Sequence, residues 1–567
     1  MKPQSIVVIV LAVVAIGAAV LLTRSGGGDD KGSSTTSTST TSNVEQAPAN
    51  AERISFVISP EKEELLKPVV GAFNAGRAQS GGKPVFVEMQ AMNSGDAENA
   101  IVRGKLKPDV WSPASSFWGR LLNFQADKAY VPDDNPSIVR TPLVIAMWEP
   151  MAKALGYPQK ALGFADINRL ATAPEGWGAA GKPEFGRFKY VHTNPDSSTS
   201  GASAVAASYY AAAGKREGLT EADVEREAAK VKDLEASIVH YGDSTLFIAD
   251  QLCEHGMAYA SAAAMEEATL IELNGRRNCT GGKLVAIYPE GGTFFSDSPF
   301  IVLDAPWVTP AKRAAAEVFQ QYLAAHIDGE TAGRYGFRPG NPDNAAGGLV
   351  NASRGADPAQ PGRELRLPEP KVVDRILRTW RRDRKPANVM LVLDNSGSMN
   401  DERKLERAKE GLAAFFRQVA PQDEIGLMKF SSEVVPLVEP APYSQNKDQL
   451  EAALADVFPE DDTAVYDATF EAVEAIKRTA DEDHINAVVV LTDGEDTNSG
   501  RGAQEVIQRL RREGRSESNG VRVFTIAYGS EPNARVLQRF ADASGGKAFV
   551  GNTDDIEQVY RSISSFF

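Results

Sequence analysis

The segment at residues 388–399, Asn-Val-Met-Leu-Val-Leu-Asp-Asn-Ser-Gly-Ser-Met, constrains the fold more than any other part of the chain. Its first half is short and almost continuously apolar, which is typical of a strand buried on both faces of a parallel sheet. The strand should end at Asp394, and the loop after it carries Ser396 and Ser398. Alternate residues on such a loop point the same way, so we expect these three side chains to converge. One carboxylate and two hydroxyls suit a hard cation such as Mg²⁺.

Two further polar residues complete this pattern. Thr463 comes just before a helical pattern, and Asp493 follows a second apolar strand at residues 487–491. Both residues should lie at the carboxyl ends of parallel strands, where open α/β sheets bind ligands. The predicted metal ligands are therefore Asp394, Ser396, Ser398, Thr463 and Asp493.

With these residues in place, residues 387–567 resemble the von Willebrand factor A (VWA) family, whose metal-ion-dependent adhesion site uses this triplet. The resemblance implies a doubly wound, Rossmann-like α/β fold and a bound Mg²⁺, Mn²⁺ or Ca²⁺ ion. It also implies a protein partner that offers an Asp or Glu carboxylate to the metal. The chain departs from the family at Asp461 and Asp462, where glycines are frequent. These two carboxylates either tighten the metal site or cap the next helix.

The periodicity of residues 387–567 predicts the same architecture independently of that resemblance. Short apolar strands alternate with amphipathic helices, which is the pattern of a doubly wound sheet. The predicted strands are residues 389–393, 425–430, 434–438, 487–491, 521–528 and 548–550. The predicted helices are residues 402–418, 447–456, 465–479, 503–513, 534–543 and 556–564.

Residues 51–350 form a second α/β pattern, whose size is that of a domain with two lobes. A strand at residues 54–59 and a helix at 61–75 open it, and two polar clusters lie at the starts of later helices. A helix N-terminus favours anions and polar oxygens, although a single Ser, Thr or Asp there is usually only a cap. Residues 197–200 supply four hydroxyls, so ligand contact is favoured at 199–201, with residues 242–245 as a second candidate.

This region looks like a type II extracellular solute-binding domain, a periplasmic-binding-protein-like fold. The resemblance rests on residues 191–201, 240–245, 265–274 and 336–340. It implies a cleft between two lobes that holds a small polar solute. The ligand-binding residues expected from the clusters and the resemblance are Ser59, Ser94, Ser115, Ser198, Thr199, Ser200, Gly201, Asp243, Ser244 and Glu267. Because Asp243 and Glu267 would repel an anion, they favour a cationic, zwitterionic or protonated solute.

Charge and cysteine content exclude several classes of function. The formal charge of −15 argues against nucleic acid and anionic membrane surfaces as partners. The only two cysteines, Cys253 and Cys279, exclude a Cys-rich zinc module, and form either one disulfide or two buried thiols. No Ser-His-Asp arrangement, nucleophile elbow or phosphate-binding Gly-rich loop is evident, so we do not expect an enzyme.

The N-terminal segment and the connector complete the organisation. Residues 6–22 are unbroken apolar sequence, which favours a single-pass membrane anchor with the bulk of the chain extracytoplasmic, or alternatively a cleaved signal and a secreted protein. Residues 1–24 would then be the anchor or signal segment, and the Ser/Thr/Gly-rich residues 25–50 should be a flexible tether. In the connector, 351–386, a helix over 371–384 carries Val373, Ile376, Leu377 and Trp380 on one face.

Three functions remain open from the sequence. The favoured one is a binding protein that combines a small-solute site with a metal-dependent protein-interaction domain. The second is the solute receptor of an ABC-type uptake system, with the VWA-like domain as a docking module. The third is a chaperone-like subunit for metal insertion or assembly.

Overall fold

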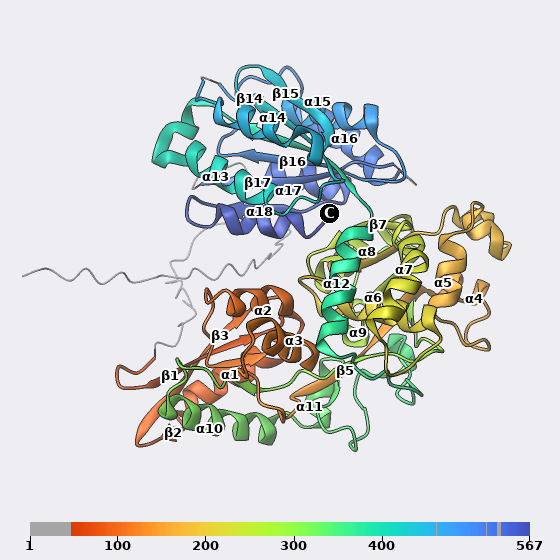
Figure 1. Cartoon of the computed structure of the whole chain (residues 1–567), viewed down its shortest axis with the longest axis vertical. Helices are drawn as coiled ribbons and strands as arrows, with labels where there is room; N and C mark the ends of the chain where they lie inside the picture. Colours follow the sequence, from red (N-terminus) through yellow and green to blue (C-terminus); the bar gives the residue numbers. More distant parts are fainter. Residues whose placement is uncertain (1–46, 461, 517–518, 530–533) are drawn as a thin grey trace, which may run out of the picture. The chain divides into compact units, whose positions relative to one another are not determined.

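The computed structural model describes residues 47–460, 462–516, 519–529 and 534–567, and residues 47–567 belong to one compact unit. The unit contains three β-sheets, all of which mix parallel and antiparallel strand pairs. In the third sheet every pair except β14–β15 is parallel. Two sheets belong to the N-terminal α/β domain and form its two lobes. The third belongs to the C-terminal domain (Figure 1).

Lobe 1 is built on the five-stranded sheet β11-β4-β1-β3-β2. Its strands are β1 (Glu52–Ile58), β2 (Gln79–Ser80), β3 (Lys83–Ala91), β4 (Val110–Ser112) and β11 (Ile301–Val302). Its helices are α1 (Glu63–Gly76), α2 (Ser94–Val102), α3 (Ser116–Ala126) and α10 (Pro310–His326). The chain therefore leaves this lobe after α3 and returns for β11, as expected for a two-lobed domain.

Lobe 2 is built on the path β10-β5-β8-β6-β7, with β9 and β12 also paired to β5. Its strands are β5 (Val139–Trp148), β6 (Tyr190–Thr193), β7 (Ile238–Gly242), β8 (Ala262–Glu266), β9 (Leu284–Ile287), β10 (Phe295–Ser296) and β12 (Arg338–Pro339). Its helices are α4 (Glu149–Ala154), α5 (Phe164–Ala171), α6 (Thr199–Ala213), α7 (Glu221–Glu235), α8 (Thr245–His255), α9 (Glu267–Leu273) and α11 (Gly329–Arg334). A disulfide joins Cys253 at the end of α8 to Cys279.

The C-terminal domain has the six-stranded order β15-β14-β13-β16-β17-β18, with β13 in the interior. Its strands are β13 (Ala387–Asp394), β14 (Glu424–Phe430), β15 (Val434–Pro442), β16 (Ile485–Thr492), β17 (Arg522–Tyr528) and β18 (Ala548–Gly551). Its helices are α13 (Lys404–Phe416), α14 (Tyr443–Ala455), α15 (Val465–Thr479), α16 (Ala503–Gly514), α17 (Ala534–Ser544) and α18 (Ile556–Ser564). The two-domain α/β fold predicted from the sequence is confirmed, with every predicted strand and helix of this domain present.

The connector helix α12 (Pro370–Asp383) packs against both lobes, contacting α3 of lobe 1 and α6 and α7 of lobe 2 (Figure 1). Its predicted apolar face is buried as expected. Val373 and Leu377 join the core around α3, whereas Ile376 and Trp380 join the core of lobe 2. The helix thus packs its apolar face inside the protein.

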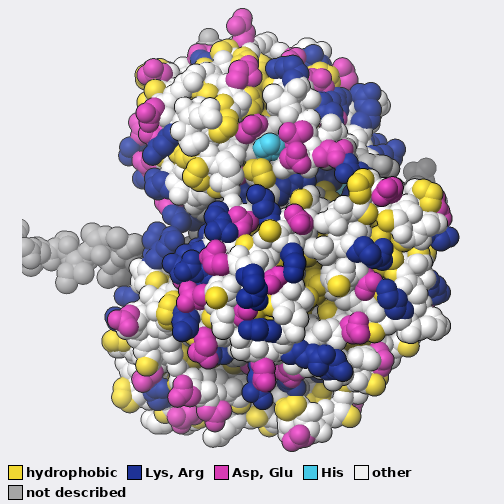
Figure 2. All heavy atoms as spheres, turned by 45° about the vertical axis from the view of Figure 1, so that its right-hand side comes forward, with side chains coloured by type: hydrophobic (Ala, Val, Ile, Leu, Met, Phe, Trp, Pro, Cys, Tyr) yellow, Lys and Arg dark blue, Asp and Glu magenta, His cyan; other side chains and the backbone are white. Residues whose placement is uncertain are grey.

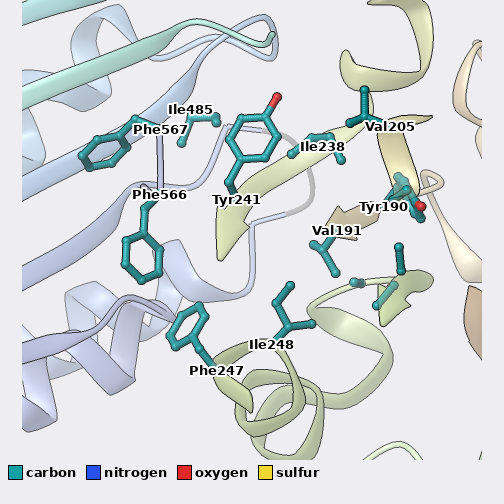
Figure 3. Packing of buried hydrophobic residues seen from close by; sticks show 14 of the residues in the cluster. Tyr190, Val191, Val205, Ile238, Tyr241, Phe247, Ile248, Ile485, Phe566 and Phe567 are labelled. Atoms are coloured by element: carbon teal, nitrogen blue, oxygen red, sulfur yellow. The ribbon is translucent and has the colours of Figure 1, made fainter. Parts of the chain in front are cut away.

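Lobe 2 and the C-terminal domain share one apolar core. Figure 3 shows Phe566 of the C-terminal domain beside Phe247 of lobe 2, with Phe567 turned towards its own domain. The Phe247 and Phe566 ring centroids lie 5.0 Å apart, and the Tyr241 N–H donates to the Phe566 carbonyl at 3.3 Å. A buried ion pair, Arg384 to Asp423 at 2.7 Å, fixes the connector to the start of β14.

The surface carries charges of both signs. Figure 2 shows Lys and Arg side chains interspersed with Asp and Glu over the face that it presents. Because opposite charges alternate, the net charge of −15 does not concentrate into a single acidic area on that face.

The predicted membrane location requires correction. Among the residues that the structure describes, no helix is both long and apolar enough to cross a membrane. The predicted anchor at residues 6–22 and most of the predicted tether lie outside the described residues. The prediction of a single-pass membrane protein is therefore not upheld.

The disulfide generates a prediction about stability. Replacing both Cys253 and Cys279 with Ser releases a loop of 26 residues in the unfolded chain, which should lower the free energy of unfolding by about 3 kcal/mol. Urea denaturation followed by circular dichroism measures this change. Reducing the wild-type protein should reproduce the loss, whereas an unchanged midpoint in both experiments would contradict it.

Candidate functional site

The predicted metal ligands surround the carboxyl end of β13. Asp394 is the last residue of this strand and is fully buried. Its two carboxylate oxygens accept hydrogen bonds from the Ser396 N–H at 2.8 Å and from the Thr492 hydroxyl at 2.5 Å. Thr492 ends the neighbouring parallel strand β16, so the sheet itself positions both sides of the site.

The remaining predicted ligands continue from this carboxylate. The Ser396 and Ser398 hydroxyl oxygens lie 3.2 Å apart, and Ser398 donates to Asp493 at 2.7 Å. A Cβ built on Gly494 would lie 3.5 Å from the Thr463 hydroxyl and 3.9 Å from that of Ser398. The structure therefore brings together all five residues that the sequence pattern nominated.

The chemistry of this donor set fits a hard divalent cation. It offers two carboxylates and three hydroxyls, and oxygen donors are those that Mg²⁺ and Ca²⁺ prefer. Burial raises the pKa of Asp394 to about 6, and the nearby Asp493 carboxylate contributes to the rise. A cation beside these two carboxylates would offset the cost of burying their charge.

A lysine that the sequence analysis did not single out also belongs to this site. Lys404, the first residue of α13, donates to the outer carboxylate oxygen of Asp493 at 2.6 Å. It lies outside the spacing of the metal motif, so only the fold reveals it. Asp462 is exposed and its backbone N–H donates to Ser432, while Asp461 lies outside the described residues. A metal role for these two acids therefore stays a prediction.

The second candidate site is the cleft between the lobes. Five of the predicted ligand residues line one small cavity there: Ser59, Ser94, Ser198, Thr199 and Ser244. The first two come from lobe 1 and the others from lobe 2. The cavity measures about 20 Å³, which is room for a single water molecule. A larger solute therefore requires the lobes to move apart.

Direct hydrogen bonds hold the lobes in this closed arrangement. The Trp118 indole of lobe 1 donates to the Thr199 hydroxyl of lobe 2 at 2.7 Å, and the Gly95 N–H donates to the Ser197 carbonyl at 2.8 Å. A Cβ on Gly95 would lie 2.1 Å from the Asp196 carbonyl oxygen, so this contact requires glycine. Asn93 also donates to the Asp243 carbonyl across the cleft at 3.0 Å.

Three other predicted ligand residues stand behind the cavity wall. Ser115 caps α3 by accepting from the Phe117 N–H. Ser200 shares hydrogen bonds with the hydroxyls of Thr193 and Thr245 at 2.8 and 2.9 Å, and the Gly201 N–H donates to Thr193. Ser200 and Gly201 thus shape the start of α6, whereas Ser115 shapes the start of α3.

The two predicted carboxylates point elsewhere. Asp243 pairs with Lys547 of the C-terminal domain. Glu267 is fully buried in a bidentate pair with Arg338, with both contacts at 2.8 Å. Neither side chain therefore lines the cavity, and each is neutralised by a cation elsewhere.

The charged residues that do lie at the cavity were missed in the sequence. Glu61 and Glu266 are part of its lining, and Glu266 accepts from the hydroxyl of Thr245, which belongs to the predicted cluster at 242–245, at 3.0 Å. Burial raises the pKa of Glu266 to about 7, with the negative charge of Glu61 adding to the rise. The fully buried Lys62 donates to Ser59, which places an ammonium behind the same wall. All five residues of β8 are buried, so no polar alternation in the sequence marks Glu266.

Family models match both domains. One described as a bacterial extracellular solute-binding protein matches residues 54–338, and one described as a von Willebrand factor type A domain matches residues 388–563. A Mycobacterium tuberculosis H37Rv protein, which is uncharacterised, is 23% identical over 519 residues, covering 87% of this chain and 73% of that protein. Inter-alpha-trypsin inhibitor heavy chain H4 of Bos taurus is 26% identical over 171 residues, or 29% of this chain. The match spans only 18% of that heavy chain's length.

Solved structures similar to each domain are also known. The periplasmic binding protein AfuA from Actinobacillus pleuropneumoniae, solved with exogenous fructose-6-phosphate, has 13% identity and a TM-score of 0.41, covering 60% of this chain and 100% of that one. A von Willebrand factor type A structure from Catenulispora acidiphila has 17% identity and a TM-score of 0.28, covering 32% and 42%. The mussel byssus proximal thread matrix protein 1, with zinc in its metal-ion-dependent adhesion site, has 15% identity and a TM-score of 0.28, covering 32% and 47%.

The metal set predicts the effect of one substitution. Asp394→Asn keeps the size of the side chain but removes its charge, so Mg²⁺ affinity measured by titration calorimetry should fall at least about tenfold, since a carboxylate is a charged ligand. Asp401→Asn, which alters an exposed carboxylate in the same loop, is the matched control and should bind as the wild type does. Equal affinity for all three proteins would show that Asp394 is not a ligand.

Proposed function

Because the chain belongs to the bacterial extracellular solute-binding protein family and carries a VWA domain, we propose that it binds a small polar solute and, through a divalent cation, a protein partner. The observation that supports this most directly is the convergence of the five metal-site residues from separate elements. A solute domain and a protein-interaction domain would then act within one molecule. No catalytic step is part of the proposal.

The cleft favours a solute with both charge and hydrogen-bonding groups. Its cavity is lined by hydroxyls from both lobes together with the Glu61 and Glu266 carboxylates, and Lys62 lies behind them. Two carboxylates and one buried ammonium favour a cationic or zwitterionic solute over an anion. Hinge motion would separate the lobes to admit the solute and close them around it.

In the VWA domain, Asp394, Ser396, Ser398, Thr463 and Asp493 would hold the cation. When bound, the cation supplies a Lewis-acidic position for an Asp or Glu of a partner protein. Lys404 keeps Asp493 oriented through its 2.6 Å contact and reduces the negative charge of the donor set. Fewer negative ligands leave the cation more positive, which strengthens its attraction for an external carboxylate.

Solute binding can be tested by native mass spectrometry of the full chain. The wild type and Asp394→Asn should both retain a small molecule, whereas Ser198→Leu should lose it because the apolar side chain replaces a hydroxyl of the cleft. Circular dichroism checks that each variant folds. A small molecule retained equally by all three proteins would place the solute elsewhere.

Partner binding needs its own measurement. A surface coated with an Asp-containing peptide should retain the wild type in Mg²⁺ and release it in EDTA. Asp394→Asn should not bind under either condition, and Asp401→Asn should behave as the wild type. Binding that survives EDTA would argue against a metal-bridged contact and favour a docking module of another kind.

Cleft closure should depend on pH. The closed cleft raises the pKa of Glu266 from 4.5 to about 7, and burial also raises that of Asp96 to about 6 and of Glu98 to about 8. A raised carboxyl pKa means that the closed form holds its proton more tightly. Closure is therefore fully favoured below about pH 4.5 and weakens as the pH rises towards 8.

Small-angle scattering without added solute should show the radius of gyration increasing from pH 5 to pH 8. Glu266→Gln should reduce this increase, since the shift of its pKa is worth about 3 kcal/mol. Glu272→Gln, on the half-exposed face of α9, is the control and should respond as the wild type does. A radius independent of pH in the wild type would contradict the prediction.

A further inference from the structure

A pocket of about 190 Å³ lies where lobe 2, the connector and the VWA domain meet. We call it the junction pocket. Lobe 2 contributes the segments just before β6 and β7, the connector contributes Lys385, and the VWA domain contributes residues at the starts of β16 and β17. The solute cleft and the metal loop are instead at the carboxyl ends of these strands. The pocket is therefore separate from both sites.

Lys385 brings a buried cation without a direct ion pair among the described residues to this pocket. The residue lies between α12 and β13 and is only 9% exposed. Its ammonium donates to the carbonyls of Ala236 and Ile238 at 3.4 and 3.2 Å. Within the part of the chain that the structure describes, no carboxylate forms an ion pair with it. Burial lowers the pKa of Lys385 to about 8, although the charges of Asp483, Asp481 and Glu482 oppose this shift.

Arg522 contributes a second buried cation, which comes from the VWA domain. It is the first residue of β17, is 5% exposed, and lines the same pocket. Its guanidinium donates to the Ser544 carbonyl at 2.5 Å, and none of the described carboxylates pairs with it. Burial lowers the pKa of Arg522. A buried guanidinium has five N–H donors, and one carbonyl leaves most of them available.

The other charges of the lining do not cancel these two cations. Arg187 and Glu482 neutralise each other in an ion pair across the junction. Lys189 donates to the Ala258 carbonyl, and Asp483 stands at an exposed position. With Arg187 and Glu482 paired, Lys385 and Arg522 face one further lining carboxylate, Asp483, so the balance of these residues is positive.

We propose that the junction pocket binds a small oxyanion of the phosphate type, held by Lys385 from the connector and Arg522 from the VWA domain. A lysine supplies a point charge to a phosphoryl oxygen, while an arginine supplies paired, directional donors. The anion would provide a directly bonded counter-charge, which neither cation has among the described residues. Free phosphate and the phosphoryl group of a small metabolite share this chemistry, and the pocket has room for either.

An anion at this position would hold the two domains together. Its ligands come from the connector and the VWA domain, and lobe 2 forms the opposite wall. Binding to the folded arrangement alone raises its stability by mass action. The inference does not require solute in the cleft or metal at Asp394, so it stands independently of the proposed function.

The test uses inorganic phosphate and the full chain in EDTA, which prevents a metal-phosphate complex at Asp394. We expect calorimetry to show one site per chain and thermal unfolding to move to higher temperature in phosphate, but not in potassium chloride of equal ionic strength. Lys385→Met and Arg522→Met should each weaken binding at least about tenfold. Lys232→Met, an exposed change on α7, is the matched control and should leave binding unchanged.

Lys385→Arg keeps the charge and should retain most of the affinity, which separates loss of an anion ligand from damage to the fold. Glycerol phosphate distinguishes the two sources: tighter binding than inorganic phosphate indicates a phosphorylated metabolite, and weaker binding indicates the free ion. Absence of binding by both compounds would overturn the proposal. Phosphate binding that is equal in the wild type, Lys385→Met and Arg522→Met would overturn it as well.

Discussion

A buried carboxylate, Glu235, holds together the elements on which both domains depend. It is 3% exposed and accepts hydrogen bonds from His192 of β6, Tyr241 of β7 and Trp380 of α12, at 3.0, 2.8 and 3.0 Å. Burial alone would raise the pKa of Glu235, but the His192 imidazolium and these donors lower it. The pKa of His192 is raised in turn, because the attraction of Glu235 outweighs the effect of burial. Losing any donor would leave a buried charge short of a partner.

This network explains why the connector is a helix packed within the protein and not a loose linker. Trp380 reaches Glu235 from the last turn of α12. The helix ends at Asp383, and the two residues after it are Arg384, which pairs with Asp423, and Lys385. The chain then enters β13 directly. The position of the metal loop at the other end of β13 is therefore linked, through one strand and one ion pair, to the interior of lobe 2.

The sequence predicted those features that depend on local pattern. The strand before Asp394 was recognised because it is continuously apolar, and α12 because Val373, Ile376, Leu377 and Trp380 repeat at helical spacing. The ligand residues of the cleft were harder to predict from the sequence. Ser200 and Gly201 have the same local signature as Ser198 and Thr199, and only tertiary packing decides which hydroxyls face the cavity. Glu267 was predicted as a ligand because the neighbouring sequence does not show that Arg338, 71 residues later, neutralises it.

The residues at the junction of the domains had no sequence signal at all. Lys385 and Arg522 are ordinary basic residues at the ends of elements, and their burial depends on a contact between domains. Lys404 and Lys547 are similar cases, since each pairs with a carboxylate far along the chain. Charge pairing over long sequence distances is the property that periodicity does not encode.

The core shared by lobe 2 and the VWA domain decides which parts of the molecule stay fixed when the cleft opens. Lobe 2, Ile376 and Trp380 of α12 and part of the VWA domain share one cluster of packed side chains. The residues around β1 form a second cluster, to which lobe 2 contributes only a few side chains such as Val139 and Ala268. Separation of the lobes would therefore move lobe 1 relative to lobe 2 and the VWA domain, which are packed together. The connector helix touches lobe 1 through the apolar contact of Val373 and Leu377 with α3. A solute would change the position of lobe 1 as seen from the metal loop, while the loop itself stays still.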